Sequence, residues 1–248
     1  MAKFHFVLQG KGGVGKTFVS ALLSQALMQH DDIACIDTDS VNHTFSHYKA
    51  FNVKKFDIYD NNTAGMNQSE FDNMIEYLIE SDKTAVIDNG ASSFIPLTHY
   101  IIENQLFDVL REMGHAVIIH TIITGGQGMA DTFGGLQSLL SNTPEHVQIV
   151  VWLNRHFGEI KYNGKSFSDT AIYTKNSDRF LATIPLEFKQ SQLFQNDLSH
   201  MATNKLTFEQ AISQARLMSG TRLKIMRDDI FSLIDTGLEI FPELTDAE

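Results

Sequence analysis

Residues 10–17 read Gly-Lys-Gly-Gly-Val-Gly-Lys-Thr, and this stretch decides the fold of the chain. An apolar run over 4–9 precedes it, and apolar residues at helical spacing follow it over 19–27. A strand, a glycine-rich turn and a helix in this order are the context in which G-x-x-x-x-G-K-[ST] forms a phosphate-binding loop. The glycines let backbone N–H groups approach an anion, and the helix start adds the positive end of its dipole. The sequence therefore predicts a nucleotide site here.

The two residues that close this loop have distinct predicted roles. Lys16 can reach the β- and γ-phosphates of a nucleotide, and the Thr17 hydroxyl can ligate Mg²⁺. A chance glycine-rich turn is the alternative, but four glycines, the Gly-Lys-Thr ending and the correct flanks together argue against it. The predicted nucleotide contacts are Gly12, Gly13, Val14, Gly15, Lys16, Thr17 and Phe18.

The composition bounds the cellular location and the partners of the chain. With 248 residues and a hydrophobic fraction of 43%, the chain can bury a proper core. No apolar run approaches the roughly 18–20 residues of a membrane helix, and the N-terminus lacks a signal-peptide pattern. A lone cysteine, Cys35, allows neither an intrachain disulfide nor a multi-cysteine metal site. The net charge of −11 argues against coating nucleic acid through bulk charge. We therefore expect a cytoplasmic protein without membrane insertion.

Short β-rich runs alternate with helical patterns along the whole chain. Strands are predicted over 4–9, 33–37, 84–88, 116–123, 148–153 and 180–184, the last ending before Pro185. Helices are predicted over 16–27, 71–79, 92–113, 130–140 and 221–240, a loop over 40–68, and a short acidic tail at the end. This alternation predicts an α/β fold, with a doubly wound, mostly parallel sheet and helices on both faces, as one domain over 1–248. In such sheets ligands bind beyond the carboxyl ends of the strands.

Asp88 closes the buried-strand pattern Ala-Val-Ile-Asp over 85–88, which has the Walker B form. An acid at this position can hold Mg²⁺ opposite Thr17. The alternative is an aspartate that caps the following turn. The phosphate-binding loop in the same chain favours the metal role.

Lys11 distinguishes this loop from an ordinary one, which needs only the second lysine. Lys-Gly-Gly-Val-Gly-Lys-Thr over 11–17 resembles the deviant Walker A ATPases, the family of plasmid-partition ParA and septum-positioning MinD. The resemblance implies a homodimer that sandwiches two ATP molecules, with Lys11 acting across the interface as an arginine finger does elsewhere. A solvated loop lysine is the alternative.

Further positions fit the same resemblance. Asp37-Thr38-Asp39 matches the family's D-x-D, which implies that Asp39 orients the attacking water and that Asp37 supports the magnesium shell. Asn154 is similar to the family's adenine-reading asparagine, and 182–186, with Pro185, resembles the segment that lies along the base. The implied catalytic residues are Lys11, Lys16 and Asp39, and the implied metal ligands are Thr17, Asp37, Asp39 and Asp88.

The chain also departs from the common pattern of this family. Ser40 stands in place of the usual proline, Phe18 in place of a second threonine, and Asn-Gly-Ala-Ser-Ser over 89–93 in place of Thr-Pro-Pro. Taken whole, the stretches at 8–11, 35–39, 86–94 and 151–154 most resemble the TraL-type ATPases of conjugative plasmids. That resemblance spans most of the chain.

Two other groups of residues have competing interpretations. Asp39, His43 and His47 are spaced for a metal site on a helix, but the intervening residues favour a loop with solvated histidines. A basic group late in the chain could face DNA, but its acidic neighbours favour a salt-bridged surface. This group comprises Arg216, Arg222, Lys224 and Arg227.

Together these features predict a slowly hydrolysing, ATP-dependent dimerising switch in plasmid transfer, partition or positioning. Its cofactors would be ATP and Mg²⁺, and its partner DNA or a DNA-binding adaptor protein. Two alternatives remain open: a nucleotide-gated binding module with little hydrolysis, and a P-loop kinase.

Overall fold

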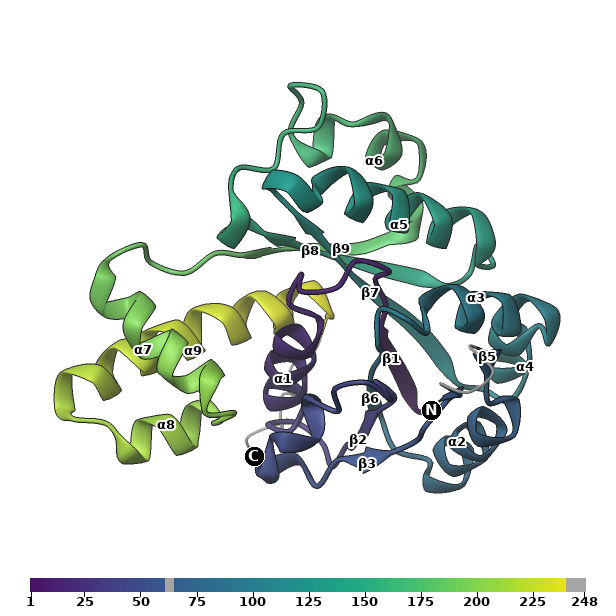
Figure 1. Ribbon diagram of the computed structural model, residues 1–248, viewed down its shortest axis with the longest axis horizontal. Coiled ribbons are helices and arrows are strands. Elements are labelled where there is room, and N and C mark those ends of the chain that lie inside the picture. Colours follow the sequence, from purple (N-terminus) through teal and green to yellow (C-terminus); the bar gives the residue numbers. More distant parts are fainter. Residues whose placement is uncertain (61–64, 240–248) are drawn as a thin grey trace, which may run out of the picture.

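A seven-stranded sheet, in which every adjacent pair of strands is parallel, forms the centre of the molecule (Figure 1). The computed structural model describes residues 1–60 and 65–239. The sheet has the order β3-β2-β6-β1-β7-β8-β9, and β4 and β5 pair separately and antiparallel. The strands are β1 Lys3–Val7, β2 Ala34–Asp37, β3 Lys54–Lys55, β4 Tyr59–Asp60, β5 Gly65–Met66, β6 Ala85–Asp88, β7 Ala116–Thr124, β8 Gln148–Asn154 and β9 Phe180–Leu186.

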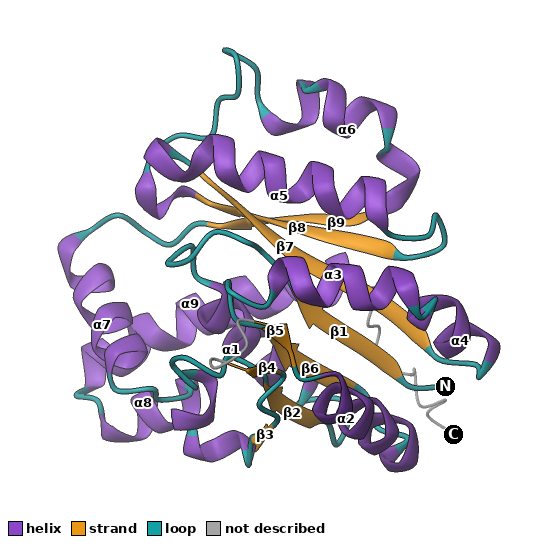
Figure 2. Ribbon diagram, turned by 45° about the vertical axis from the view of Figure 1, so that its right-hand side comes forward, coloured by secondary structure: helices purple, strands orange, loops and turns teal. Residues whose placement is uncertain are grey.

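Helices cover both faces of the sheet, so the predicted doubly wound α/β fold is confirmed. Figure 2 shows α2, α3, α4 and α5 along one face and α1 and α9 along the other. The helices are α1 Lys16–Leu27, α2 Gln68–Ser81, α3 Phe94–Glu103, α4 Leu106–Glu112, α5 Met129–Asn142, α6 Ala171–Lys175, α7 Gln192–Thr203, α8 Phe208–Gln214 and α9 Leu217–Gly237. Two 3-10 turns, η1 Phe45–His47 and η2 Lys49–Phe51, follow β2.

The alternation of side chains along each strand divides the core into two layers. On β1, Phe4 and Phe6 pack against the α2–α5 face, whereas Val7 packs against the α1 and α9 face. Phe4 and Phe6 are fully buried, and burial of such a side chain stabilises the fold by about 1.5–3 kcal/mol. Because β1 lies in the middle of the sheet, both layers anchor the strand that leads into the loop at 10–17.

The structure corrects several predicted boundaries. The helix predicted over 92–113 is divided into α3 and α4 by Gln105, whose φ of 48° lies in the left-handed region. The strand predicted to end before Pro185 continues through it to Leu186. Proline is tolerated there because β9 is an edge strand of the sheet and, among the described residues, pairs with β8 alone.

The loop predicted over 40–68 also contains short regular elements, namely η1, η2 and β3–β5. The last helix is longer at its start than predicted and ends at Gly237. Residue 240 and the acidic tail lie outside the described residues, as do 61–64 in the predicted loop.

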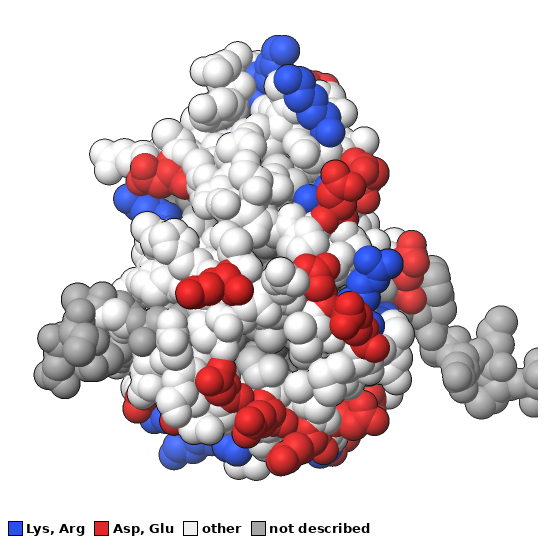
Figure 3. All heavy atoms as spheres, turned by 90° about the vertical axis from the view of Figure 1, so that its right-hand side faces the viewer, with Lys and Arg blue, Asp and Glu red and all other residues white. Residues whose placement is uncertain are grey.

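The surface reflects the acidic composition of the chain. Figure 3, which views the side of the molecule that carries α2 and α4, shows more acidic than basic side chains. None of the helices in the described part of the chain combines the length and apolar character needed to cross a membrane. The charge of this side makes it a poor surface for nucleic acid.

Candidate nucleotide-binding site

The predicted site residues converge at one edge of the sheet. The loop at 10–17 follows β1, Asp37 ends β2, Asp88 ends β6 and Asn154 ends β8. All these strands are parallel, so their carboxyl ends lie at the same edge. The chain leaves β1 for β2 on one side of the sheet and later returns to β7 on the other, which makes this edge a topological switch point.

The loop between β1 and α1 has the backbone of an anion-binding turn. Gly13 has a φ of 74° and Gly15 a φ of 102°, both in the left-handed region that glycine adopts without strain. Gly15 is the N-cap of α1, so the helix begins at Lys16 and directs its first N–H groups toward the loop. Lys16 Nζ donates a hydrogen bond to the carbonyl oxygen of Lys11 at 3.2 Å. The ammonium group therefore lies over the loop.

The ammonium group of Lys16 is largely enclosed, and burial lowers its pKa. The negative charges of Asp88 and Asp39 oppose that shift. A buried cation beside two carboxylates is suited to bind the phosphate groups of a nucleotide.

Asp88 accepts hydrogen bonds from two hydroxyl groups of α1. Thr17 Oγ1 lies 2.7 Å from Asp88 Oδ2, and Ser20 Oγ lies 2.8 Å from Asp88 Oδ1. Burial raises the pKa of the Asp88 carboxyl to about 7, against the opposing effect of these two hydrogen bonds. The sequence predicted the pairing of Asp88 with Thr17 but missed Ser20, which lies one helical turn beyond Lys16.

The oxygen donors of Thr17 and Asp88 fit Mg²⁺, which proteins usually hold through one or two carboxylates together with substrate phosphates. No group of three or more histidine, cysteine or acidic side chains within residues 1–60 and 65–239 is arranged to hold a metal ion alone. A site that shares its ion with a nucleotide does not need such a group.

The two aspartates of the D-x-D stretch lie in different environments. Asp37 is fully buried and accepts hydrogen bonds from the backbone N–H groups of Asp39 and Ser46, and burial raises its pKa. Asp39 is partly exposed and lines the cavity beside the loop at 10–17. The bonds of Asp37 shape the turn that presents Asp39.

Gly90 makes room for the Asp39 carboxylate. A Cβ at position 90 would lie 2.9 Å from Asp39 Oδ1 and 3.3 Å from its Cα. Asp39 Oδ1 also accepts weak hydrogen bonds from the N–H groups of Val41 and Asn42. The close approach of β6 and β2 at this point requires glycine.

Lys11 points toward α5 of its own subunit. Its Nζ lies 2.8 Å from Asp131 Oδ2, in the first turn of α5, and both side chains are about half exposed. The sequence analysis assigned no role to Asp131. The cross-subunit role implied for Lys11 stays a prediction.

Two adjoining cavities flank the loop. One, of about 450 Å³, is lined by the loop and by Asp39, Val41, Asn42, Thr44, Ala91 and Ser92. The other, of about 330 Å³, lies between the loop, Asn154 and residues 186–203. Phe18 lines both, and its ring centroid lies 6.1 Å from that of Phe188. The first has the groups for phosphates, and the second has aromatic walls suited to a base.

Asn154 is anchored within the protein. Its Nδ2 donates to the carbonyl oxygen of Val14 at 2.9 Å, and its Oδ1 accepts from the N–H of His156. Asn154 therefore fixes the loop while lining the second cavity. Pro185 lies one residue before this cavity wall, which begins at Leu186.

Two buried side chains that the sequence analysis did not single out hold the site together. Gln9 Nε2 donates to the carbonyl oxygens of Ile122 and Thr132, and so joins the start of the loop to β7 and α5. Asn89 accepts from Thr38 Oγ1 at 2.9 Å and joins β6 to β2. In the sequence, each of these side chains is a polar residue at the end of an apolar run, and this pattern could have identified Gln9 and Asn89 as residues of the site.

Ion pairs bear on the two groups of residues for which the sequence allows competing interpretations, the histidines after Asp39 and the late basic group. His43 Nε2 lies 3.1 Å from Asp57 Oδ1, so it belongs to a loop contact. In the late basic group, Arg222 Nε lies 2.5 Å from Asp197, and Arg227 pairs with Glu209 and Asp228. These pairs support the salt-bridged surface for two of its four members.

The parallel sheet, the glycine loop at its switch point and the Thr17–Asp88 contact define a P-loop nucleotide-binding domain. The model of the CobQ/CobB/MinD/ParA nucleotide binding domain matches residues 5–210, and the chain belongs to this family.

Two proteins named TraL, both from Escherichia coli, are similar to nearly the whole chain. They are 43% and 40% identical over 240 residues, which cover 96% of this chain and 99% of each relative. A ParA family ATPase from Chlorobium tepidum TLS shares the fold, with a TM-score of 0.52 at 12% identity. That similarity covers 91% of this chain and 98% of that structure. The predicted resemblance to ParA, MinD and TraL is confirmed.

Proposed function

We propose that the protein is an ATP-dependent dimerising switch that hydrolyses ATP slowly in the cytoplasm and acts in conjugative plasmid transfer, partition or positioning. The observation that carries this proposal is the convergence of Lys16, Thr17 and Asp39 on one cavity, with Asp88 bonded to Thr17. Membership of the family and the similarity to TraL support it.

The proposed reaction transfers the γ-phosphoryl group of ATP to water. The loop N–H groups and Lys16 would hold the β- and γ-phosphates, and Asp39 would orient the attacking water. Thr17 and Asp88 would hold Mg²⁺, which supplies charge neutralisation at these phosphates. Lys11 would leave Asp131 and reach the phosphates bound by a second subunit. Hydrolysis would then reopen the dimer.

The partner in this proposal is DNA or a DNA-binding adaptor protein. The acidic side of the molecule in Figure 3 and the ion pairs of Arg222 and Arg227 favour the adaptor. A gel-shift assay with the ATP-bound dimer and plasmid DNA, repeated with high salt, tests direct binding.

Two substitutions test the reaction. We expect Lys16→Ala to lose both nucleotide binding and hydrolysis, because Lys16 faces the phosphates. We expect Lys11→Ala to retain binding and lose hydrolysis, because its charge would be needed only in the dimer. Normal hydrolysis by Lys11→Ala would contradict the cross-subunit role.

Light scattering measures the dimer directly. We expect a monomer with ADP and a dimer with a slowly hydrolysed ATP analogue. A monomer with both nucleotides would count against the switch.

A nucleotide-gated binding module with little hydrolysis is the second candidate. The Lys11–Asp131 ion pair favours it, because the lysine implied in catalysis is engaged within its own subunit. A sensitive phosphate-release assay, with and without DNA, distinguishes the two candidates.

A further inference from the structure

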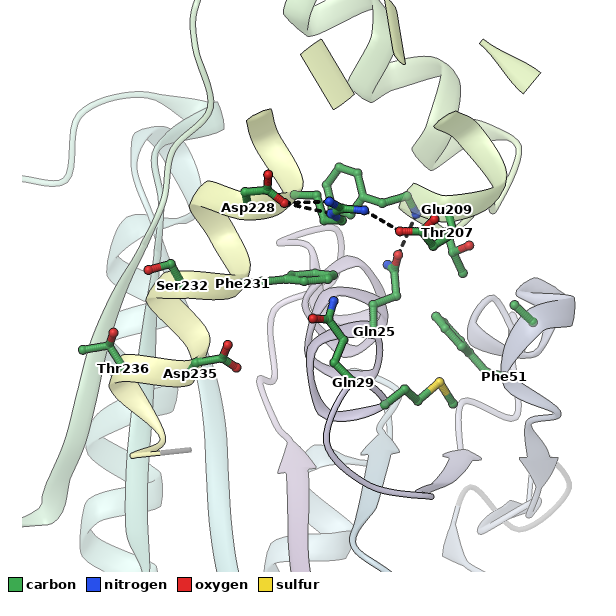
Figure 4. A pocket seen from close by; sticks show the side chains of 14 residues that line it. Gln25, Gln29, Phe51, Thr207, Glu209, Asp228, Phe231, Ser232, Asp235 and Thr236 are labelled. Atoms are coloured by element: carbon green, nitrogen blue, oxygen red, sulfur yellow. Dashed lines mark hydrogen bonds and ion pairs between the residues drawn. The ribbon is translucent and has the colours of Figure 1, made fainter. Parts of the chain in front are cut away.

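A large groove lies on the helical face of the molecule, between the C-terminal half of α1 and α9 (Figure 4). The start of α8 closes one end, and η2 forms the opposite wall. Its volume is about 860 Å³, and it shares no lining residue with the two cavities beside the loop at 10–17. The groove is therefore a separate candidate binding site.

The base of the groove is apolar. Phe51, Phe208 and Phe231 contribute buried rings, and the rings of Phe208 and Phe231 pack edge to face with centroids 5.8 Å apart. Met28, at the end of α1, is 38% exposed within the groove. A thioether and aromatic rings form an adaptable seat for an apolar side chain.

The rim of the groove is polar and negatively charged. Three carboxylates line it, from Glu209, Asp228 and Asp235, against one guanidinium, from Arg227. The Arg227 guanidinium lies 2.5 Å from Glu209 Oε1 and 2.9 Å from Asp228 Oδ1, so one cation forms ion pairs with two carboxylates. The lining thus carries an excess of two negative charges, within a chain whose net charge is −11.

Polar side chains on α9 and just after α1 leave hydrogen-bonding capacity in the groove. Within the described chain, the side chains of Gln29, Ser232 and Thr236 form no hydrogen bond. Figure 4 shows Ser232 and Thr236 on α9, and Gln29 lies in the turn just after α1. Gln25 differs, because its Oε1 accepts from the N–H of Phe208 at 2.7 Å and so holds α8 against α1. The rim carboxylates have partners of their own, because Arg227 pairs with Glu209 and Asp228, and His30 Nε2 lies 3.3 Å from Asp235 Oδ1. A cationic ligand would therefore exchange with these contacts.

We propose that this groove binds a cationic amphipathic helix of a partner protein. The polar positions from Asp228 to Thr236 extend over about two turns of α9, or about 12 Å, which matches a short helix laid beside α9. One apolar side chain of the partner would pack on Met28 and Phe231. Its lysine or arginine side chains would pair with the rim carboxylates, which complement them in charge.

The position of the groove relates it to the nucleotide site without depending on the proposed ATPase activity. α1 begins at Lys16, and η2 follows the turn that presents Asp39. A helix in the groove would touch both segments at the ends remote from the nucleotide.

A designed peptide tests the proposal on the full chain. The probe is a fluorescein-labelled helix of about 14 residues, with leucine on one face and lysine on the other. We expect saturable binding by fluorescence anisotropy, and no binding of the same peptide with glutamate in place of lysine. Absence of binding by the lysine peptide would overturn the proposal.

Matched variants locate the binding. Asp228→Asn/Asp235→Asn removes two charges from the rim, and Glu76→Gln/Glu80→Gln removes two exposed charges from α2 on the other face. We expect at least a tenfold weaker Kd for the first variant and less than a twofold change for the second. An equally weaker Kd in both variants would indicate general attraction of the peptide to an acidic protein, and would refute the assignment of the groove as its binding site.

A second substitution guards against misfolding of the first variant. Ser232→Arg changes an exposed position of α9 and places a bulky cation in the groove, so the peptide should bind at least tenfold more weakly. Unchanged binding by Ser232→Arg would contradict the proposal. Self-association of the unaltered chain that Ser232→Arg abolishes would assign the groove to a second copy instead.

Discussion

Lys11 Nζ and Asp131 Oδ2 lie 2.8 Å apart within one subunit, although the sequence implies that Lys11 acts in another. The pair ties the loop at 10–17 to the first turn of α5. The proposed contact with a second subunit would require Lys11 to leave Asp131. The ion pair therefore competes with the proposed dimer.

Asp131→Asn should favour the dimer. An exposed ion pair contributes about 0.2–1 kcal/mol, and each dimer would break two such pairs, one in each subunit. Their loss should therefore raise the dimerisation constant about 2- to 30-fold with a slowly hydrolysed ATP analogue. Sedimentation analysis measures this constant. Glu159→Gln removes a comparable exposed pair with Lys161 and should leave it unchanged. Weaker dimerisation of Asp131→Asn would mean that Asp131 itself contributes to the interface.

Gly90→Ala should slow hydrolysis while nucleotide binding is retained. The added Cβ would lie 2.9 Å from Asp39 Oδ1 and displace the carboxylate proposed to orient water. A displacement of this kind can reduce turnover by about 10- to 100-fold. The rate of phosphate release and the Kd for ATP measure the two effects. The double variant Gly90→Ala/Asp39→Asn should lose no more turnover than Asp39→Asn alone, because both substitutions act on the same carboxylate. Additive losses of turnover would show that Gly90 affects hydrolysis through a group other than Asp39.

Adjacent glycines of α5 should respond in opposite directions to alanine. A Cβ on Gly135 would lie 2.2 Å from the buried Gln9 Oε1, so Gly135→Ala should lower the free energy of unfolding by about 1–3 kcal/mol. Gly134 is exposed and has open space, so Gly134→Ala should raise it by up to about 1 kcal/mol through helix propensity. Urea unfolding measures both. Equal effects would show that Gln9 does not constrain α5.

Acid should destabilise the protein through two buried histidines. Trp152 Nε1 donates to His120 Nδ1 at 3.0 Å, so neutral His120 carries its proton on Nε2 and donates to His5 Nδ1 at 2.9 Å. Burial lowers the pKa of His5 to about 3 and that of His120 well below its usual value. Below pH 6.5 each of these two histidines therefore binds more protons in the unfolded chain than in the folded chain. The contribution of each histidine to the free energy of unfolding should fall by about 1.4 kcal/mol per pH unit as pH decreases toward 3, while the raised pKa values of the Asp88 and Asp37 carboxyls act in the opposite direction.

Urea unfolding between pH 7 and pH 4 checks this expectation. His5→Gln should make the decrease shallower by roughly the contribution of one histidine, about 1.4 kcal/mol per pH unit. The exposed His99→Gln is the matched control and should leave the slope unchanged. An unaltered slope in His5→Gln would show that His5 is not the group that titrates on unfolding.

The predicted sheet, loop and acidic positions were accessible to sequence analysis because each depends on local pattern. Glycines and a lysine at set spacing before a helix predicted the loop at 10–17, and apolar runs that end in acid placed Asp37 and Asp88. The boundaries of the strands were less predictable. To predict that a strand continues through Pro185, one must know that β9 lies at an edge of the sheet, and only the strand order shows this.

By itself the sequence determined the fold class, the family and the position of the glycine-rich loop at 10–17, because these follow from short-range spacing of glycine, lysine and apolar residues. The tertiary structure alone decided that Asp131 holds Lys11, that Gln9 ties the loop to the carbonyl of Thr132, and that α1 and α9 enclose a groove. Gln9 and Thr132 are 123 positions apart in the chain. Contacts at such separations depend on how the strands are ordered in the sheet, and no local periodicity records that order.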